Sequence, residues 1–359
     1  MLPSEGMPSS RERPRLSVIV PVRNGLQYLP QSLTALRGSD LPASRWELIV
    51  VDDSSHDGSG DLAGLYADRV IRLLDGPCGP AIARNHGVAV ARGELLAFID
   101  ADVRVHRDTL RLMVETFDAD QTVSAVFGAY DLTPSAPGLV SQYRNLLHRY
   151  VHERDAGSSV TFWTGCGAVR ASVFASCGGF DEANTSIEDI ELGYRMSGLG
   201  HRILLRPEIQ GTHLKQWTFR SMVATDLRAR GIPWARLLLS RKVRSAATLN
   251  LRPPEQCATL AVGLACLALA VWMVTGERIC LAVAVAGLMA MLVLNAPLLS
   301  WFARHRGWWF AARTAPLRVV YYVLNGMSVI VALLLPTPEP RDGSSRAPNM
   351  VAPSGSSAN

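Results

Sequence analysis

The stretch Leu95-Leu96-Ala97-Phe98-Ile99-Asp100-Ala101-Asp102 is an apolar run that ends abruptly in an Asp-x-Asp pair. A short apolar run of this kind is typical of a buried strand. In open α/β sheets, ligands bind in the crevice outside the carboxyl ends of the strands. Two carboxylates at that edge suit a hard divalent cation, Mg²⁺ or Mn²⁺, which prefers oxygen ligands. The stretch therefore predicts a metal site at Asp100 and Asp102, with plain turn chemistry as the alternative.

The residues before this stretch alternate between strand and helix patterns. Residues 16–20 and 48–51 are apolar runs that predict buried strands, and a short strand is expected near residues 70–73. Gly79-Pro80-Ala81 begins a helix that we expect to end near Arg92. Such alternation predicts right-handed crossovers and an α/β fold with a mostly parallel sheet. The chain has no GxGxxG after the first strand and no GxxxxGK[ST], which disfavours ordinary dinucleotide-binding and P-loop proteins.

Polar side chains follow three of the predicted strands. The first strand ends in Pro21-Val22-Arg23-Asn24, the second in Asp52-Asp53-Ser54-Ser55, and the fourth in Asp100-Ala101-Asp102. If these strands are neighbours, one crevice receives all four carboxylates, and the third helix offers Arg84 and Asn85. Carboxylates can hold a ribose and a base, and helix N-termini add N–H donors to phosphate. Helix capping is the alternative role for the Asp52-Asp53 pair, and it weighs more for Asp53 than for Asp52.

These segments, in this order and spacing, resemble family-2 glycosyltransferases of the GT-A fold. Residues 17–24 resemble the opening strand of that family, 47–58 its nucleotide-contacting segment, and 79–87 and 100–102 its third-helix and metal motifs. The resemblance covers about residues 15–220 and implies a Rossmann-like sheet that binds a nucleoside-diphosphate-sugar donor, most simply a UDP-sugar. It implies donor contacts from Pro21, Asn24, Asp52, Asp53, Arg84, Asn85, Asp100 and Ala101.

The second half of the resemblance, residues 104–220, concerns the acceptor. Two glycine-rich clusters, 164–170 and 178–182, precede Glu188-Asp189 and a helix expected over 190–198. By resemblance Asp189 is the base that removes the acceptor proton during inverting transfer, and burial would suit a carboxylate to that role. An acidic pair that stabilises a helix N-terminus is the simpler alternative. The acceptor contacts implied are Gly165, Glu188 and Trp217.

Three further features of this half are ambiguous from sequence. Val123–Tyr130 predicts a strand, and residues 134–159 contain a helix whose basic and histidine residues favour a solvated face over an acceptor surface. His213, after a strand expected over 202–205, is either a metal or diphosphate ligand or a structural histidine. Gln216-Trp217 stands where processive members of the family carry Gln-x-x-Arg-Trp, so we expect single transfers.

The C-terminal third is apolar. Three windows with at most one charged residue each, about 256–276, 279–303 and 317–336, are long enough to cross a bilayer as helices. Arginine and lysine residues cluster before the first window and between the second and third, which places residues 1–255 in the cytoplasm by the positive-inside rule. We therefore predict an integral protein of the cytoplasmic (inner) membrane, with an amphipathic interfacial linker over 221–255. Because this band accounts for the basic charge, no nucleic-acid partner is expected.

The chain ends and the cysteines carry less information. Residues 1–14 and 337–359 are polar and rich in Pro and Ser, which predicts a disordered leader and tail. The six cysteines show no CxxC pair, so no zinc site is expected.

The sequence thus predicts a membrane-bound, metal-dependent, inverting and non-processive glycosyltransferase. Its catalytic domain, 15–220, comprises a nucleotide-sugar half (15–103) and an acceptor half (104–220). The acceptor group is a hydroxyl or a phosphate, on a lipid or lipid-linked glycan. One alternative is a sugar-phosphate nucleotidyltransferase, which would need a Gly-rich basic loop where Pro21-Val22-Arg23-Asn24-Gly25 stands. The other is a non-catalytic nucleotide-sugar-binding membrane protein.

Overall fold

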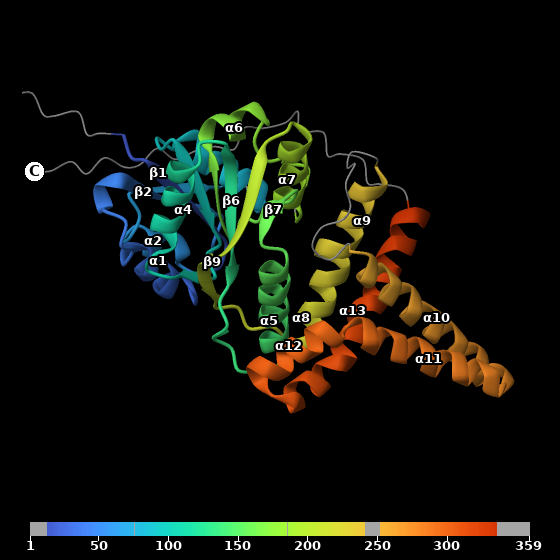
Figure 1. Ribbon diagram of the computed structural model, residues 1–359. Coiled ribbons are helices and arrows are strands. Elements are labelled where there is room, and N and C mark those ends of the chain that lie inside the picture. Colours follow the sequence, from blue (N-terminus) through green and yellow to red (C-terminus); the bar gives the residue numbers. More distant parts are fainter. Residues whose placement is uncertain (1–12, 75, 185, 241–251, 336–359) are drawn as a thin grey trace, which may run out of the picture.

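The computed structural model describes residues 13–74, 76–184, 186–240 and 252–335. Figure 1 shows a sheet flanked by helices, followed by a helical region from which α10 (Pro253–Thr275) and α11 (Arg278–Leu294) project as an arm. The predicted tail, nearly all of the predicted leader and residues 241–251 of the predicted linker lie outside the described residues.

Nine strands of the described residues form one sheet, in the order β3-β2-β1-β4-β8-β6-β9-β5, with β7 paired to β9. The first four strands are parallel, as the alternation with helices predicts. β8 runs antiparallel between β4 and β6, so the sheet combines a parallel half with antiparallel pairings. The strands are β1 (Leu16–Val22), β2 (Trp46–Asp53), β3 (Arg69–Leu73), β4 (Leu95–Ile99), β5 (Val103–Val105), β6 (Val123–Tyr130), β7 (Gly157–Ser159), β8 (Cys166–Arg170) and β9 (Arg202–His213).

Helices cover both faces of the sheet. Side chains alternate between the two faces along each strand, so Ala97 of β4 packs with α1 and α4 while its neighbour Phe98 packs with α3, α6 and α7. The helices of the sheet domain are α1 (Leu29–Arg37), α2 (Ser59–Ala63), α3 (Pro80–Ala89), α4 (Thr109–Ala119), α5 (Leu139–Arg154), α6 (Ala171–Ser176) and α7 (Glu188–Gly198), with a 3-10 turn η1 (Ala43–Arg45).

β9 is longer than predicted and continues past Leu205 to His213. Its second half pairs with β5, which places His213 opposite Val103. Because Val103 directly follows Asp102, this pairing brings His213 beside the Asp-x-Asp motif. His213, expected to come after the strand, is therefore the last residue of the strand itself.

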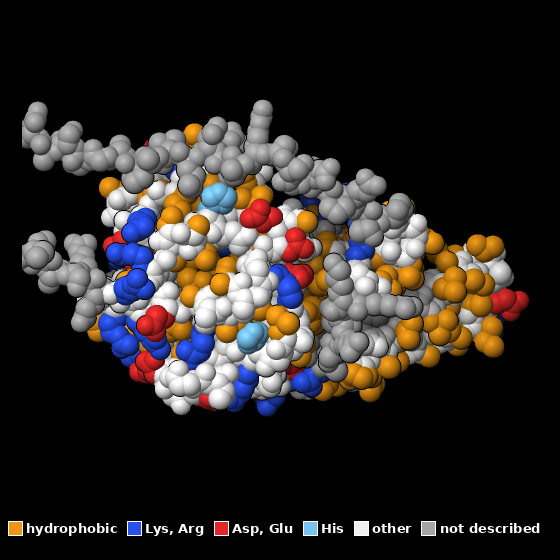
Figure 2. Space-filling view, turned by 90° about the horizontal axis from the view of Figure 1, so that it is seen from above, with side chains coloured by type: hydrophobic (Ala, Val, Ile, Leu, Met, Phe, Trp, Pro, Cys, Tyr) orange, Lys and Arg blue, Asp and Glu red, His pale blue; other side chains and the backbone are white. Residues whose placement is uncertain are grey.

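The predicted interfacial linker begins with α8 (Phe219–Ala224), π-helix η2 (Thr225–Gly231) and α9 (Ile232–Leu239). The C-terminal region contains α10 (Pro253–Thr275), α11 (Arg278–Leu294), α12 (Ala296–Arg306) and α13 (Trp308–Leu334). Of the described helices, α10 and α13 are each long and apolar enough to cross a membrane. Figure 2 shows hydrophobic side chains gathered over the projecting helical arm and charged ones over the sheet domain.

Two details differ from the three straight spans that the sequence predicts. The second window is a pair of helices, α11 and α12, bent by 59° at Asn295. Pro297, which lacks an N–H, stands at the start of α12 and interrupts the helical hydrogen bonds. The third helix begins at Trp308 and not near residue 317, so Arg313, expected between spans, lies within α13, as Arg318 does.

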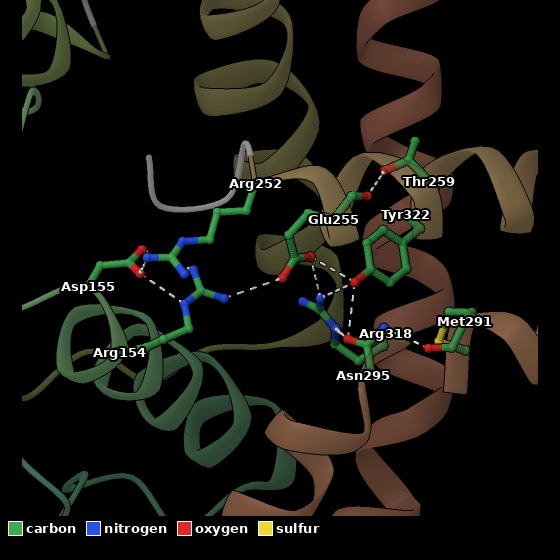
Figure 3. Close-up of polar contacts among 9 residues, drawn as sticks. All are labelled: Arg154, Asp155, Arg252, Glu255, Thr259, Met291, Asn295, Arg318 and Tyr322. Carbon is green, nitrogen blue, oxygen red and sulfur yellow. Dashed lines mark hydrogen bonds and ion pairs between the residues drawn. The ribbon is translucent and has the colours of Figure 1, made fainter. Parts of the chain in front are cut away.

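A network of charged and polar side chains joins the sheet domain to these helices (Figure 3). Arg318 of α13, which is 1% exposed, donates to Glu255 of α10 and to Asn295, each at 2.8 Å. Tyr322 donates to the same Glu255 carboxylate at 2.7 Å. At the end of α5, Arg154 lies 3.8 Å from Glu255. Asp155 forms an ion pair with Arg252, the N-cap residue of α10. The helical region is therefore docked on α5.

Candidate active site

A cavity of about 610 Å³ lies at the carboxyl ends of β1, β2 and β4. Because β1 pairs with both β2 and β4, the residues that follow these three strands meet at one edge. The predicted donor residues among its lining are Pro21, Asn24, Asp53, Arg84, Asp100 and Ala101, and the predicted metal ligand Asp102, Glu188 and Lys215 also line it. The structure thus brings most of the predicted donor residues together.

The loops after β1 and β2 are tied to each other at this edge. Asn24 adopts a left-handed backbone conformation, with φ of 49°, which asparagine tolerates better than most residues. Its side-chain oxygen accepts from the backbone N–H of His56 at 2.9 Å, and its backbone N–H donates to Ser55 Oγ at 2.9 Å. Asn24 therefore shapes the edge of the cavity as well as lining it.

Two of the predicted donor residues lie outside this lining. Asp52 accepts from the backbone N–H of Ser55 at 3.0 Å, and it is Asp53 that faces the cavity while accepting from the N–H groups of Cys78 and Gly79 before α3. Asn85 bonds the backbone of Phe180 with both atoms of its amide. In this structure Asp52 and Asn85 hold the loops around the cavity.

Arg84 of α3 links the donor cavity to α7. Its guanidinium is buried and donates to Asp100 at 2.8 Å and to Glu188. Burial raises the pKa of Asp100, and the charge of Asp102 adds to that effect although Arg84 opposes it. Burial likewise raises the pKa of Glu188, with the charge of Asp189 adding to the shift and Arg84 opposing it. Asp100, predicted as a metal ligand, is thus paired with a cation of the chain.

Asp102, His213 and Asn145 of α5 form a chain of contacts. His213 Nδ1 lies 2.7 Å from Asn145 Oδ1, and His213 Nε2 lies 3.3 Å from Asp102 Oδ2. Because an amide oxygen can only accept, Nδ1 carries a proton, and the neutral ring turns the Nε2 lone pair toward the carboxylate. The Nε2 lone pair and the Asp102 carboxylate are then two acceptors that face one another. A cation or a second proton between them would satisfy both. Burial opposes ionisation of Asp102, but when the His213 ring carries the second proton, its hydrogen bond and charge hold the pKa of Asp102 below the ordinary value.

A second cavity, of about 250 Å³, adjoins the first. Both are lined by Arg84, Asp100, Ser186 and Glu188, so they meet at these residues. Asp189 and His213 line only the second cavity. The predicted acceptor residues Glu188 and Trp217 line it too, whereas Gly165 lies outside and its carbonyl accepts from the backbone N–H of Asp100 at 3.3 Å.

Asp189 stands in the first turn of α7, facing the second cavity. One carboxylate oxygen accepts from the backbone N–H and the hydroxyl of Thr164, both at 3.3 Å, and the other accepts from the N–H of Ile190 at 2.8 Å. The helix begins at Glu188. The acidic pair can therefore stabilise the N-terminus of α7 and still place Asp189 beside the acceptor, so the two interpretations are compatible. The long bonds to Thr164 leave that oxygen able to receive a proton.

Aromatic side chains make up much of the second cavity, and sequence reasoning missed most of them. The prediction that the face of α5 bearing His148 and His152 is solvated is wrong, because both rings pack against Trp163 and line the cavity. Their spacing of four residues, which places them on one side of a helix with Asn145, was the available signal. The other aromatic lining residues are Phe127, Tyr130, Phe162, Trp163, Trp234 and Tyr321.

The two buried histidines predict a loss of stability in mild acid. Burial lowers the pKa of His152 to about 4, and burial together with His152 lowers the pKa of His148 well below its ordinary value. The unfolded chain therefore binds more protons than the folded chain between pH 6.5 and 4, so stability is present above pH 6.5 and is lost as pH falls. For His152 we expect a loss of about 2 kcal/mol between pH 7 and pH 5.

Unfolding of the detergent-purified protein at the two pH values measures this loss. His152→Gln, which keeps an amide donor for the carbonyl of Gly128 (now bonded by His152 at 2.8 Å), should flatten the pH dependence. Equal pH dependence in the parent and the variant would contradict the assignment.

The strand order, the Asp-x-Asp edge and the paired cavities define the GT-A fold. The mannosyltransferase PcManGT of Pyrobaculum calidifontis, solved with GDP-mannose and Mn²⁺, superposes with a TM-score of 0.56 over 90% of this chain and 88% of its own, at 21% identity. That similarity supports the fold.

Residues 17–178 match the family model described as glycosyl transferase family 2, so the chain contains a family-2 glycosyltransferase domain. A pre-mycofactocin glycosyltransferase of Mycobacterium tuberculosis is 31% identical over 277 residues, which are 71% of this chain and 52% of that protein. Glycosyltransferase AglE of Haloferax volcanii is 27% identical over 209 residues, 56% of this chain and 67% of that protein. The chain thus spans about half the length of the mycobacterial relative.

Proposed function

We propose that this protein transfers a single sugar from a nucleoside-diphosphate donor, most simply a UDP-sugar, to an acceptor, with inversion at the anomeric carbon. The observation that carries the proposal is the meeting of two cavities at Arg84, Asp100 and Glu188. The donor occupies the larger cavity at the strand ends, and the acceptor enters the smaller one beside Asp189. An acceptor oxygen approaching from Asp189 then attacks the donor from the face opposite its diphosphate.

Each charged residue of the site has a distinct task in this proposal. Asp189 takes the proton of the acceptor hydroxyl as its oxygen bonds to the anomeric carbon. Arg84, held by two carboxylates, keeps the junction of the cavities in place. Lys215 lines the donor cavity and stabilises the charge that develops on the leaving diphosphate.

A divalent cation, Mg²⁺ or Mn²⁺, fits Asp102 and His213. Within the described residues no three His, Cys, Asp or Glu side chains are grouped closely enough to hold a metal alone. Such ions are commonly held by one or two protein ligands together with substrate phosphates, which matches this pair. When bound there, the ion would offset negative charge on the diphosphate. The Nε2 lone pair facing Asp102 supports the assignment, and Asp100 enters only if it leaves Arg84.

Asn145→Leu is expected to lower Mn²⁺ affinity by about 10- to 100-fold, the usual cost of losing a hydrogen bond that orients a metal-bound histidine. The variant removes the acceptor that fixes the tautomer of His213. Titration of free Mn²⁺ by electron paramagnetic resonance, with UDP present, measures the affinity. Asn145→Asp keeps an acceptor oxygen and should bind Mn²⁺ better than Asn145→Leu. Unchanged affinity in Asn145→Leu would remove His213 from the metal site.

We propose further that α10, the bent pair of α11 and α12, and α13 cross the cytoplasmic membrane and that the sheet domain faces the cytoplasm, so that the acceptor is lipid-linked. The arginines at the end of α12 and early in α13 support this orientation by the positive-inside rule. Tyr321 of α13 lines the acceptor cavity, so this apolar helix forms part of the site.

Release of nucleoside diphosphate by the detergent-purified protein tests the function. The assay uses UDP-, GDP- and TDP-sugars with Mn²⁺ or Mg²⁺ and a bacterial lipid extract, with Asp189→Asn alongside. We expect release from one donor that requires metal, lipid and Asp189. Metal-dependent donor binding without release under any of these conditions would favour a non-catalytic nucleotide-sugar-binding protein.

A further inference from the structure

The acceptor cavity has two ends of opposite charge. At the junction with the donor cavity stand the carboxylates Asp100, Glu188 and Asp189, of which the first two are paired with Arg84. Elsewhere the same cavity is lined by the guanidinium groups of Arg144 and Arg230. Tyr130 also lines the cavity and is within reach of the charges of both groups. Burial raises its pKa, the charges of Asp102 and Asp100 add to the shift, and those of Arg230 and Arg144 oppose it.

The basic end carries uncompensated positive charge. Arg144 pairs with Asp226 at 2.6 Å, and the pKa of Arg144 is lowered by burial and by the charge of Arg230. Arg230 has no ion pair with any residue that the structure describes. Of the two guanidinium groups, Arg144 alone pairs with a carboxylate of the described residues. Such a pair of forked donors suits the oxygens of a phosphate group.

Arg230, which lines the cavity, stands in the π-helix η2. Wide turns of this kind are frequent at functional sites. At its end, a Cβ on Gly231 would lie 2.1 Å from Ser328 Oγ, so only glycine lets η2 approach α13 this closely. Trp234 and Tyr321, on the helices that meet here, also line the cavity. The basic end therefore lies where the sheet domain meets the apolar helix α13.

The walls between the ends suit a hydroxylated ring. Asn145 is 1% exposed and Trp217 8%, and the side-chain N–H donors of both are buried with no partner among the described residues. Buried donors without partners cost about 1–3 kcal/mol each, and ligand hydroxyl groups would satisfy them. Tyr130 and Trp163 add flat apolar surfaces against which a ring can pack.

The charges at the junction of the two cavities also indicate whether a phosphate or a hydroxyl of the acceptor attacks the donor. A phosphate at the junction would bring its negative charge against three carboxylates, and like charges at contact distance repel. A neutral hydroxyl meets no such repulsion and gives Asp189 a proton to remove. We propose, resting on the function above, that the acceptor is a hydroxyl-bearing ring attached to a phosphate, and that the hydroxyl attacks while the phosphate binds Arg144 and Arg230.

The transfer balances without another reactant. The acceptor oxygen bonds to the anomeric carbon as the bond from that carbon to the diphosphate oxygen breaks. The electron pair of that bond leaves with the nucleoside diphosphate, and the hydroxyl proton passes to Asp189. The acceptor phosphate keeps all its bonds.

Binding of four probes tests the proposal independently of turnover. These are farnesyl diphosphate linked to N-acetylglucosamine, N-acetylglucosamine 1-phosphate, octyl glucoside and farnesyl phosphate. Each is titrated against Asp189→Asn protein holding UDP or GDP and Mn²⁺, with quenching of tryptophan fluorescence as the signal. We expect the phosphate-linked sugars to bind at least 10-fold more tightly than octyl glucoside. The lipid-linked and water-soluble sugar phosphates distinguish a membrane-borne from a soluble acceptor.

Arg230→Gln should remove this phosphate preference, weakening sugar-phosphate binding about 10- to 100-fold and leaving octyl glucoside and nucleotide binding unchanged. Arg228→Gln, on the same π-helix and outside the cavity lining, is the matched control and should have no effect.

A phosphate preference that survives in Arg230→Gln, or none in the parent protein, would overturn the proposal. Formation of a glycosyl phosphate from farnesyl phosphate by the active enzyme would overturn it too, and would leave the transferase function standing. Failure of every donor to bind would instead count against the function itself.

Discussion

Asp189→Asn is expected to lower turnover by about 10²- to 10⁴-fold, the usual contribution of a positioned general base. The substitution keeps the size of the side chain and an oxygen that can accept from Thr164, so the first turn of α7 should persist. Asp189 lines the acceptor cavity and not the donor cavity, and donor affinity should therefore stay near that of the parent. Initial rates of nucleoside-diphosphate release and calorimetric titration with the nucleotide measure the two quantities.

Glu191→Gln is the matched control for this prediction. Glu191 lies on the same helix and its charge is engaged with Arg195 four residues later, outside both cavities. The pair is partly buried, so its loss should lower stability, but it should leave turnover unchanged. A variant Asp189→Asn that retains more than a tenth of parent activity would show that another group takes the proton, and Glu188 would then be the next to test.

The residues that line the donor cavity at the strand ends could be predicted from the sequence, because each of them follows a strand that is recognisable from a short local pattern. Each buried strand is a short apolar run, and polar residues follow it directly, as at Asp53 and Asp102. In a parallel sheet such residues meet at one edge whichever order the strands take. What the sequence did not reveal is which carboxylate of the Asp52-Asp53 pair faces the cavity, because that depends on the path of the chain before α3.

The acceptor cavity was harder to predict because its residues come from distant segments. Whether the α5 histidines are buried depends on contacts with Trp163 and with the carbonyl of Gly128, neither of which a helical pattern contains. The end of β9 was missed because Arg206, Pro207 and Glu208 interrupt its apolar run, although the backbone continues as a strand. Averaging hydropathy over a window also hides a single break within an apolar helix, such as the bend at Asn295 that Pro297 follows.

Glu255→Gln is expected to destabilise the protein by about 3–5 kcal/mol, the usual result of leaving a buried charge without its partner. Arg318 is buried in the helical region and depends on Glu255 for its counter-charge, with Asn295 and Tyr322 supplying neutral partners. Removing the arginine instead, as Arg318→Met, should cost less, because Glu255 remains within 3.8 Å of Arg154 and is closer to solvent. Unfolding midpoints in detergent measure both losses.

The double variant Glu255→Leu with Arg318→Met separates the energetic role of this pair from its positioning role. Because a hydrophobic replacement of a buried ion pair is often neutral or stabilising, the double variant should regain most of the stability that Glu255→Gln loses. Glu277→Gln, at the exposed turn between α10 and α11, is the control and should change nothing.

Tyr321, next to Tyr322 in α13, lines the acceptor cavity, so a helix shifted by loss of the network should weaken acceptor binding more than donor binding. If Glu255→Gln changes stability by less than about 0.5 kcal/mol, the docking of α13 on the sheet domain must depend on the apolar contacts among α5, α12 and α13 alone.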